Sequence, residues 1–331
     1  MNELFMNRCP VITVAVGFDR HTIVLTEAAV ELCRRTGKTL CLLHVVEPWL
    51  EHIHASKPLG TQDPLWNVNQ AVETNSKDLA RSKLDELAQM VPSEIPVIKR
   101  VVMGKTVDMI MKEVIETSTA MLLVGADFGN LKFVPRGLST ALSLMVSSPV
   151  PVFVADAAML AQPFVGKSRF LISDDLGFQS ETAVDFGYGL ATALRGSHVH
   201  HIHISGLTLE NLQVGLATAA ASSHTPFNTK ASAIDVYSAM NQELKNKLFR
   251  RAEKHVDFLE ASDGQTSIDV LAGTVYEQLA EHVTKVNPHV IVFGRHHAYY
   301  TKPFFIGRLP YRTMLALRRP LILVPNEGEA S

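Results

Sequence analysis

The chain carries the same sequence pattern twice, and this internal repeat limits its fold more than any other feature. The segments VVMGKTVDMIMKEVIE and VLAGTVYEQLAEHVTK align with Gly104 opposite Gly273, an offset of 169 residues. The same offset places Gly125 opposite Gly294 and aligns SPVPVFVA with RRPLILVP. Several blocks in one register indicate a duplicated structural unit. The sequence therefore predicts two copies of one unit, fused head to tail.

Each copy alternates strand-like and helix-like segments. VITVAVGFDR and RFLISDD are continuous apolar runs that end in turn residues, which is typical of buried parallel strands. A segment with helical periodicity follows each run, and then a second strand ends near His44 or His203. This alternation predicts a parallel sheet with helices on both faces and right-handed crossovers. The expected fold class is α/β, with two tandem doubly wound parallel-sheet domains.

The length of 331 residues suits two domains. We expect the first domain at residues 1–157 and the second at 166–331. The early blocks align at a smaller offset than the late ones, with Gly17 opposite Asp174. The second copy should therefore contain about a dozen additional residues, which we expect within 206–240.

Composition narrows the class of protein. Hydrophobic residues make up 47 % and charged residues 19 % of the chain, as in ordinary globular proteins. The 31 basic and 33 acidic residues nearly balance, which argues against a large nucleic-acid surface. No signal peptide or membrane-spanning run is evident, and the three cysteines are sparse. We therefore expect a cytoplasmic protein without a membrane partner.

The order of the blocks resembles the universal stress protein family. In the first copy the matching segments are VAVGFD, LLHVVEP, MGKTVDMI, LLVGA and SPVPVFVA. In the second copy they are LISDDL, HIHIS, AGTVYEQL, IVFGR and RPLILVP. The resemblance covers nearly the whole chain and implies a tandem, UspA-like protein with an adenine nucleotide alpha hydrolase-like fold.

Many members of this family bind ATP through a Gly-x-x-Gly turn followed further on by Gly-Ser/Thr, where the bare backbone can approach the phosphates. In the first copy, Phe128 and Leu138 occupy the second and third glycine positions. In the second copy His297 occupies the second position, whereas Gly307 keeps the third and Arg308 follows it. Bulky side chains at such positions obstruct phosphate contact, so neither copy has the complete pattern.

The second copy keeps more of the pattern, including an Asp at the end of its first strand, which in the family contacts the adenosine end. The resemblance therefore implies that ATP, if it binds, binds in the second domain, where Arg295 or Arg308 could pair with phosphate. The candidate ligand-binding residues are Asp174, Gly273, Gly294, His297, Gly307 and Arg308. In the alternative interpretation the glycines only form turns after strands, and Asp174 caps a helix.

No other pattern predicts a catalytic or metal site. His198 and His200 should share one face of their strand, and His201 and His203 the other, but no third metal ligand is evident. The sequence contains no GxSxG, HExxH or phosphate-loop motif. We therefore assign no catalytic residue and no metal ligand, and we expect the chain not to be an enzyme.

The function expected from these features is that of a noncatalytic stress-response or regulatory module. Two alternatives stay open. One is a slow ATP hydrolase or another nucleotide-using enzyme, and the other is a protein-interaction adaptor that binds no nucleotide. The last strands, at 150–154 and 320–324, are expected to pair with each other because that would protect exposed sheet edges. Such pairing would make the chain an intramolecular pseudo-dimer, which could also form a homodimer.

Overall fold

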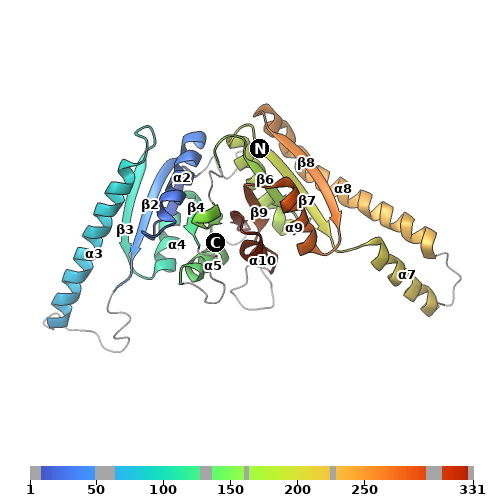
Figure 1. The fold of residues 1–331 in the computed structure, drawn as a ribbon, viewed down its shortest axis with the longest axis horizontal. Coiled ribbons are helices and arrows are strands. Elements are labelled where there is room, and N and C mark those ends of the chain that lie inside the picture. The colour runs from blue at the N-terminus through green and yellow to red at the C-terminus, as the bar shows by residue number, and fades with distance from the viewer. Residues whose placement is uncertain are drawn as a thin grey trace.

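Ten strands form one continuous sheet across the part of the chain that the computed structural model describes (Figure 1). The described residues are 9–48, 64–126, 136–159, 164–223, 229–295 and 308–326. The N-terminal half supplies β1 (Val11–Ala15), β2 (Thr39–Val46), β3 (Val97–Met103), β4 (Thr119–Gly125) and β5 (Val152–Ala155). The C-terminal half supplies β6 (Arg169–Ser173), β7 (His198–Ser205), β8 (Gln265–Ala272), β9 (Val290–Gly294) and β10 (Leu321–Val324).

The two halves meet at their last strands. The strand order is β3-β2-β1-β4-β5-β10-β9-β6-β7-β8, parallel within each half and antiparallel between β5 and β10. Phe153 lies opposite Ile322, its own equivalent in the repeat, and Val154 lies opposite Leu321. Such self-complementary pairing of equivalent strands is the pattern of a twofold interface. The predicted pairing of the last strands within one chain is confirmed.

Helices cover both faces of the sheet, because each helix buries one apolar stripe. One buried core lies under α2 (Thr22–Thr36), α3 (Pro64–Gln89), α6 (Glu181–Ala193) and α8 (Thr229–Ala261). The other lies under α4 (Thr106–Glu116), α5 (Arg136–Ser147), α9 (Val275–Val286) and α10 (Arg308–Leu317). The doubly wound α/β architecture is therefore confirmed. No helix in the described ranges combines the length and the apolar character needed to cross a membrane.

Unusual backbone conformations recur at equivalent positions of the two halves, as the helices and strands do. Gly104 before α4 and Gly273 before α9 have φ angles of 145° and 138°. Phe18 and Leu176, which follow the first strand of each half, both have left-handed φ angles, of 52° and 61°. Left-handed non-glycine residues are uncommon, so their recurrence at matching positions is a strong sign of duplication.

These markers correct the expected alignment of the first strands. The amide of Val16 donates to the carbonyl of Leu43, and the amide of Asp174 donates in the same way to that of Ile202. The residue equivalent to Asp174 is therefore Val16, not Gly17. The sequence alignment matched the turn residues, whereas the hydrogen-bond ladder defines where each strand ends.

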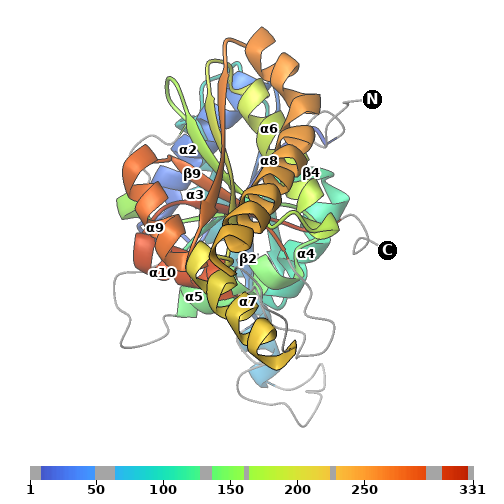
Figure 2. The same cartoon turned by 90° about the vertical axis from the view of Figure 1, so that its right-hand side faces the viewer.

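The extra residues of the second half lie between β7 and the middle of α8. The buried positions of α3 and the turn after it (Ala80, Leu84, Leu87, Val91) have the same spacing as those of α8 (Leu248, Ala252, His255, Leu259). This spacing makes Lys83 and Arg251 equivalent, at an offset of 168, whereas His44 and His203 differ by 159. The added residues therefore fall in the stretch that contains α7 (Leu209–Ser223) and the first half of α8, largely within the expected 206–240 (Figure 2). Two short 3-10 turns, η2 (Ala157–Met159) and η3 (Phe178–Ser180), complete the elements discussed below.

Two arginines tie the halves together beside the central strands. Arg35 at the end of α2 donates to the carbonyl groups of Phe164, Gly166 and Arg195. Arg295 after β9 donates to the carbonyl of Ser148 at 2.7 Å, just past the end of α5. Cations at the C-terminal ends of helices interact favourably with the unpaired carbonyl groups there. The junction between the halves is therefore fixed by charged groups as well as by strand pairing.

Removing apolar volume at the junction should destabilise the whole chain. Ile322 is fully buried in β10, so Ile322→Ala should lower the free energy of unfolding by about 2–5 kcal/mol. Ile23→Ala is the matched control, because that side chain is 50 % exposed on α2 and its loss should cost less than about 0.5 kcal/mol. Denaturant unfolding followed by circular dichroism measures both. Similar losses for the two variants would contradict a close-packed junction.

Candidate functional site

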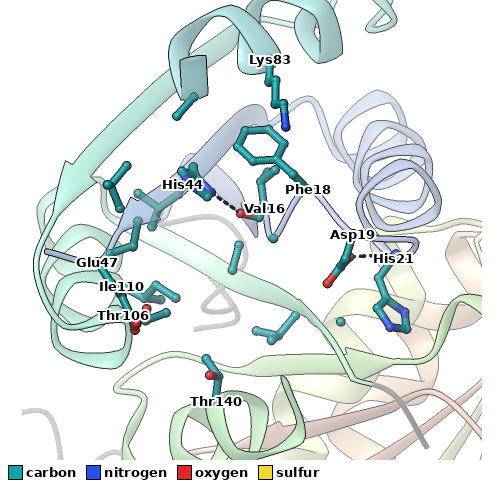
Figure 3. Close-up of a pocket in the computed structure, with 18 of the residues that line it drawn as sticks. Val16, Phe18, Asp19, His21, His44, Glu47, Lys83, Thr106, Ile110 and Thr140 are labelled. Carbon is teal, nitrogen blue, oxygen red and sulfur yellow. Dashed lines mark hydrogen bonds between the residues drawn. The ribbon is translucent and has the colours of Figure 1, made fainter. Parts of the chain in front are cut away.

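A pocket of about 580 Å³ opens at the carboxyl ends of β1, β2 and β4 in the N-terminal half (Figure 3). The chain leaves β1 toward β2 on one side and reaches β4 on the other, so the pocket lies at a topological switch point. Ligands of open α/β sheets bind at such points, and the volume is within the range of small-molecule sites.

One wall of the pocket is aromatic. The rings of Phe18 and His44 lie 4.4 Å apart, tilted by 40°. His44 Nδ1 donates to the carbonyl of Val16 at 2.7 Å, which fixes the orientation of the imidazole. Burial lowers the pKa of His44, and the nearby charge of Lys83 lowers it further, against the opposing effect of the Val16 hydrogen bond. His44 is therefore a neutral ring at pH 7 and suits a flat, uncharged part of a ligand.

A cation stands above this wall. Lys83 projects from α3 with its Nζ 5.1 Å from the centroid of the Phe18 ring (Figure 3). Such a distance is within the range of cation–π contacts. Among the residues that the structure describes, no carboxylate lies within ion-pair distance of Lys83. The ammonium group is therefore at the rim of the pocket without an internal anion.

The two carboxylates of the pocket, Asp19 and Glu47, lie away from Lys83 and have partners in the protein. Asp19 accepts a hydrogen bond from the His21 amide at 2.9 Å, at the start of α2. The Thr106 hydroxyl donates to Glu47 across the far side of the pocket (Figure 3). Thr140 of α5 completes the lining on that side. The pocket is thus electrostatically uneven, with its cation on α3 and its carboxylates elsewhere.

Gly125, where the family pattern begins its phosphate loop, has a packing role in this chain. A Cβ atom at this position would come within 2.6 Å of the Cβ of His21. His21 is buried, and its Nδ1 accepts a hydrogen bond from the Ala157 amide at 2.9 Å. Because Gly125 has no side chain, there is room for the buried His21, which links the start of α2 to the segment after β5. Contact with phosphate is not needed to explain it.

The corresponding place in the C-terminal half is occupied by the protein itself. Asp174 follows β6 at the position of Val16 and is only 2 % exposed. Its Oδ1 accepts hydrogen bonds from the Leu176 amide (2.7 Å), the Ser180 hydroxyl (2.6 Å) and Arg251 (2.8 Å). Its Oδ2 faces Nε2 of His201 at 3.2 Å. Both carboxylate oxygens are thus engaged by internal donors.

Arg251 of α8 holds the loop after β6 through both terminal nitrogens. One nitrogen donates to Asp174 and to the Ser180 hydroxyl at 2.9 Å. The other donates to the carbonyl groups of Leu176 at 2.9 Å and Gly177 at 2.8 Å. A guanidinium fork with four acceptors in one loop is a strongly oriented contact. Arg251 therefore fixes the loop that follows β6.

This network keeps Asp174 ionised. Burial by itself raises the pKa of the carboxyl group, but hydrogen bonds from His201, Ser180 and the Leu176 amide outweigh it and lower the pKa to about 2. The Ser180 hydroxyl bonds to the carboxylate and not to an imidazole, so this is not the order of a hydrolase triad. Ser180 also occupies the N-cap position of α6, but its side chain makes no capping hydrogen bond there.

The remaining predicted ligand residues that the structure describes lie where β8 and β9 end and where α10 begins. Gly273 forms the turn before α9, and Gly294 ends β9 beside Val324 of β10. Arg308 is the first residue of α10. His297 and Gly307 lie outside the described residues.

Arg295 does not have the phosphate-binding role considered for it. The side chain is buried, with 4 % exposed, and it donates to Ser148 of the other half. The predicted division of the β7 histidines is confirmed, because His198 stacks on His200, whereas His201 and His203 both reach Asp174. Within the described ranges no group of three or more candidate ligands could hold a metal ion.

Lys83 and Arg251 are among the site residues that the sequence did not single out. They lie on long helices whose alignment is obscured by the extra residues before them. The matching pattern of buried positions in α3 and α8 was the one signal that could have aligned them.

Comparison with known proteins gives the family of the first half. Residues 10–156 match the universal stress protein family. No curated protein matches the chain.

Solved structures share the fold over nearly the entire chain. A universal stress protein from Archaeoglobus fulgidus is 14 % identical, with a TM-score of 0.59 and 96 % of each chain covered. A putative universal stress protein from Pseudomonas aeruginosa is 13 % identical, with a TM-score of 0.58, 98 % of this chain covered and 96 % of that one. A functionally unknown protein from the same organism has the same identity and TM-score, with 98 % and 95 % covered. Residues 10–156 therefore belong to the universal stress protein family, and the chain as a whole has the fold of universal stress proteins that match it over nearly their full length.

Proposed function

We propose that this chain is a noncatalytic ligand-binding module of the universal stress protein family, and that its ligand binds in the N-terminal half. The observation that carries this proposal is the contrast between the two clefts. The pocket at the end of β1 is lined by rings and by Lys83, which has no ion pair among the described residues, whereas Arg251 binds the loop at the end of β6 through both terminal nitrogens. The nucleotide site first expected around Asp174 is therefore proposed at the equivalent position of the first half.

An adenine nucleotide is the ligand class that the family resemblance implies, and the pocket offers groups for it. Phe18 and the neutral ring of His44 could stack on a flat base. Thr140 lies near the N-terminus of α5, where helix amide groups favour a phosphate. Gly17 at the pocket mouth lets the chain turn close to a ligand.

The arrangement of polar groups supports binding without chemistry. A nucleotide-using enzyme needs an accessible base or nucleophile within hydrogen-bond reach of its substrate. In the described residues, Asp174 and His201 are buried in mutual contact, and His44 is bound to a backbone carbonyl. We therefore propose a regulatory role in the cytoplasm, in which ligand occupancy, and not turnover, carries the signal.

Filling the first pocket should abolish binding, whereas filling the second cleft should not. Val46 lines the pocket at the end of β2, and Ser205 is its equivalent in β7. The carbonyl of Val46 accepts a hydrogen bond from the Gly104 amide, and the carbonyl of Ser205 accepts one from the amide of Gly273, the repeat equivalent of Gly104. Calorimetric titration with ATP, AMP and adenosine should give heat with the wild type and Ser205→Trp, and none with Val46→Trp. Bound ligand should also raise the melting temperature of the first two proteins only.

Two results would count against this assignment. Absence of heat from the wild type with all three probes at near-millimolar concentration would exclude an adenine ligand. Loss of binding in Ser205→Trp but not in Val46→Trp would move the site to the second half. Melting curves of both variants without ligand show whether either substitution unfolds the protein.

If the second cleft is structural, the charge of Asp174 should contribute to stability and not to binding. Its pKa is about 2 in the folded chain and about 4 in an unfolded chain, so the ionised group stabilises the fold above pH 4. That contribution, about 2–3 kcal/mol, is lost as the pH falls from about 4 to about 2. Asp174→Asn should remove this component of the acid destabilisation, whereas Asp175→Asn, at the exposed neighbour, should keep it. Identical pH profiles of the two variants, measured by urea unfolding, would contradict the role given to Asp174.

A further inference from the structure

The two halves place a cation at the same position on their long helices. Lys83 of α3 and Arg251 of α8 both precede the second buried residue of a matching pattern, Leu84 in one half and Ala252 in the other. Both side chains reach toward the loop that follows the first strand of their half, where Phe18 and Leu176 are equivalent. The structural framework around the two cations is therefore shared.

In the part of the chain that the structure describes, the anion that meets this cation is present in one half only. In the C-terminal half the Asp174 carboxylate pairs with Arg251 at 2.8 Å. In the N-terminal half the equivalent residue is Val16, an apolar side chain that is 4 % exposed. Lys83 instead lies over the Phe18 ring, and within the described ranges it has no carboxylate partner. Among the described residues, the first half thus has the cation without an internal counter-charge.

The two carboxylates that line the same pocket do not replace it. Asp19 accepts from the His21 amide, and Glu47 accepts from Thr106. Both lie on sides of the pocket away from Lys83 (Figure 3). The charge of Lys83 reaches into the pocket, since it lowers the pKa of His44 on the aromatic wall in addition to the larger effect of burial.

We propose that the N-terminal pocket binds a small organic anion, whose carboxylate or phosphate pairs with Lys83 and whose flat ring lies against Phe18 and His44. The ligand would supply the negative charge that Asp174 supplies in the second half. This inference rests on the proposed function, because it assumes that the pocket is a ligand site. It adds that Lys83 determines which ligands bind, and that a nucleotide would turn its charged end toward α3.

Matched neutral and anionic probes test the role of Lys83. Adenosine and AMP form a phosphate pair, and indole and indole-3-carboxylate form a carboxylate pair. For wild-type protein, calorimetry should show tighter binding of the anionic member of at least one pair. Lys83→Met should weaken binding of that anion by about fivefold, which corresponds to one ion pair at a partly exposed site, and should leave the neutral member unchanged. Lys77→Met, on the same helix but outside the pocket lining, is the matched control and should change neither.

A second variant copies the other half. Val16→Asp places a carboxylate where the C-terminal half has Asp174, and Lys83 is then available to pair with it. This variant should lose affinity for the anionic probes as the Lys83→Met variant does. Its melting curve shows whether it folds, and Lys83→Met, an exposed position, remains informative if it does not.

The outcomes separate this inference from the proposed function. If none of the four probes, nor ATP, binds the wild type, the proposed function fails and the inference fails with it. If the probes bind but Lys83→Met retains the full preference for the anion, the inference is wrong while the pocket remains a ligand site. The inference is also overturned if neutral and anionic members bind equally well to the wild type.

Discussion

The antiparallel pairing of β5 with β10 is the contact on which the rest of the structure depends. It joins two five-stranded parallel sheets into one and removes the two edges that these strands would otherwise expose. Phe153 pairs with Ile322, its own repeat equivalent, so the two halves face each other as the subunits of a twofold dimer would. Arg35 and Arg295 then bind carbonyl groups across the junction. The duplicated pattern thereby forms one continuous sheet with two equivalent places at the strand ends.

Duplication gave the two clefts the same scaffold, and a few side chains made them different. Where the second half has Asp174 and Arg251, the first has Val16 and Lys83. A buried carboxylate next to a guanidinium group is tolerated only when each satisfies the other, as Asp174 and Arg251 do at 2.8 Å. In the first half an apolar residue takes the place of the carboxylate, and both the pocket and the lysine charge are present there. The same position on the fold is thus a structural brace in one half and a candidate ligand site in the other.

The repeat, the doubly wound architecture and the pairing of the last strands could be predicted from the sequence, because apolar runs and turn glycines report on local structure. The site could be predicted only in part. Asp174 could be identified because an aspartate at the end of the first strand is part of the family pattern. Arg251 could not, because it lies 77 residues further along the chain and meets that carboxylate only in the folded structure. The alignment of Gly17 with Asp174 was based on turn residues. The hydrogen bonds between the strands show that Val16 is the residue equivalent to Asp174. Gly125 matches the first glycine of the family's phosphate loop, but in the structure His21 fills the space that the missing side chain leaves.

The most direct test of the contrast between the clefts is hydrogen–deuterium exchange of the whole protein with and without excess AMP. The prediction is slower exchange in the peptides that contain Val16, Phe18 and His44, because these residues border the open pocket. Exchange around Asp174 and Ser180 should be the same in both samples, since Arg251 already occupies that cleft. Slower exchange around Asp174, with none at the first pocket, would contradict the assignment of the ligand site to the N-terminal half.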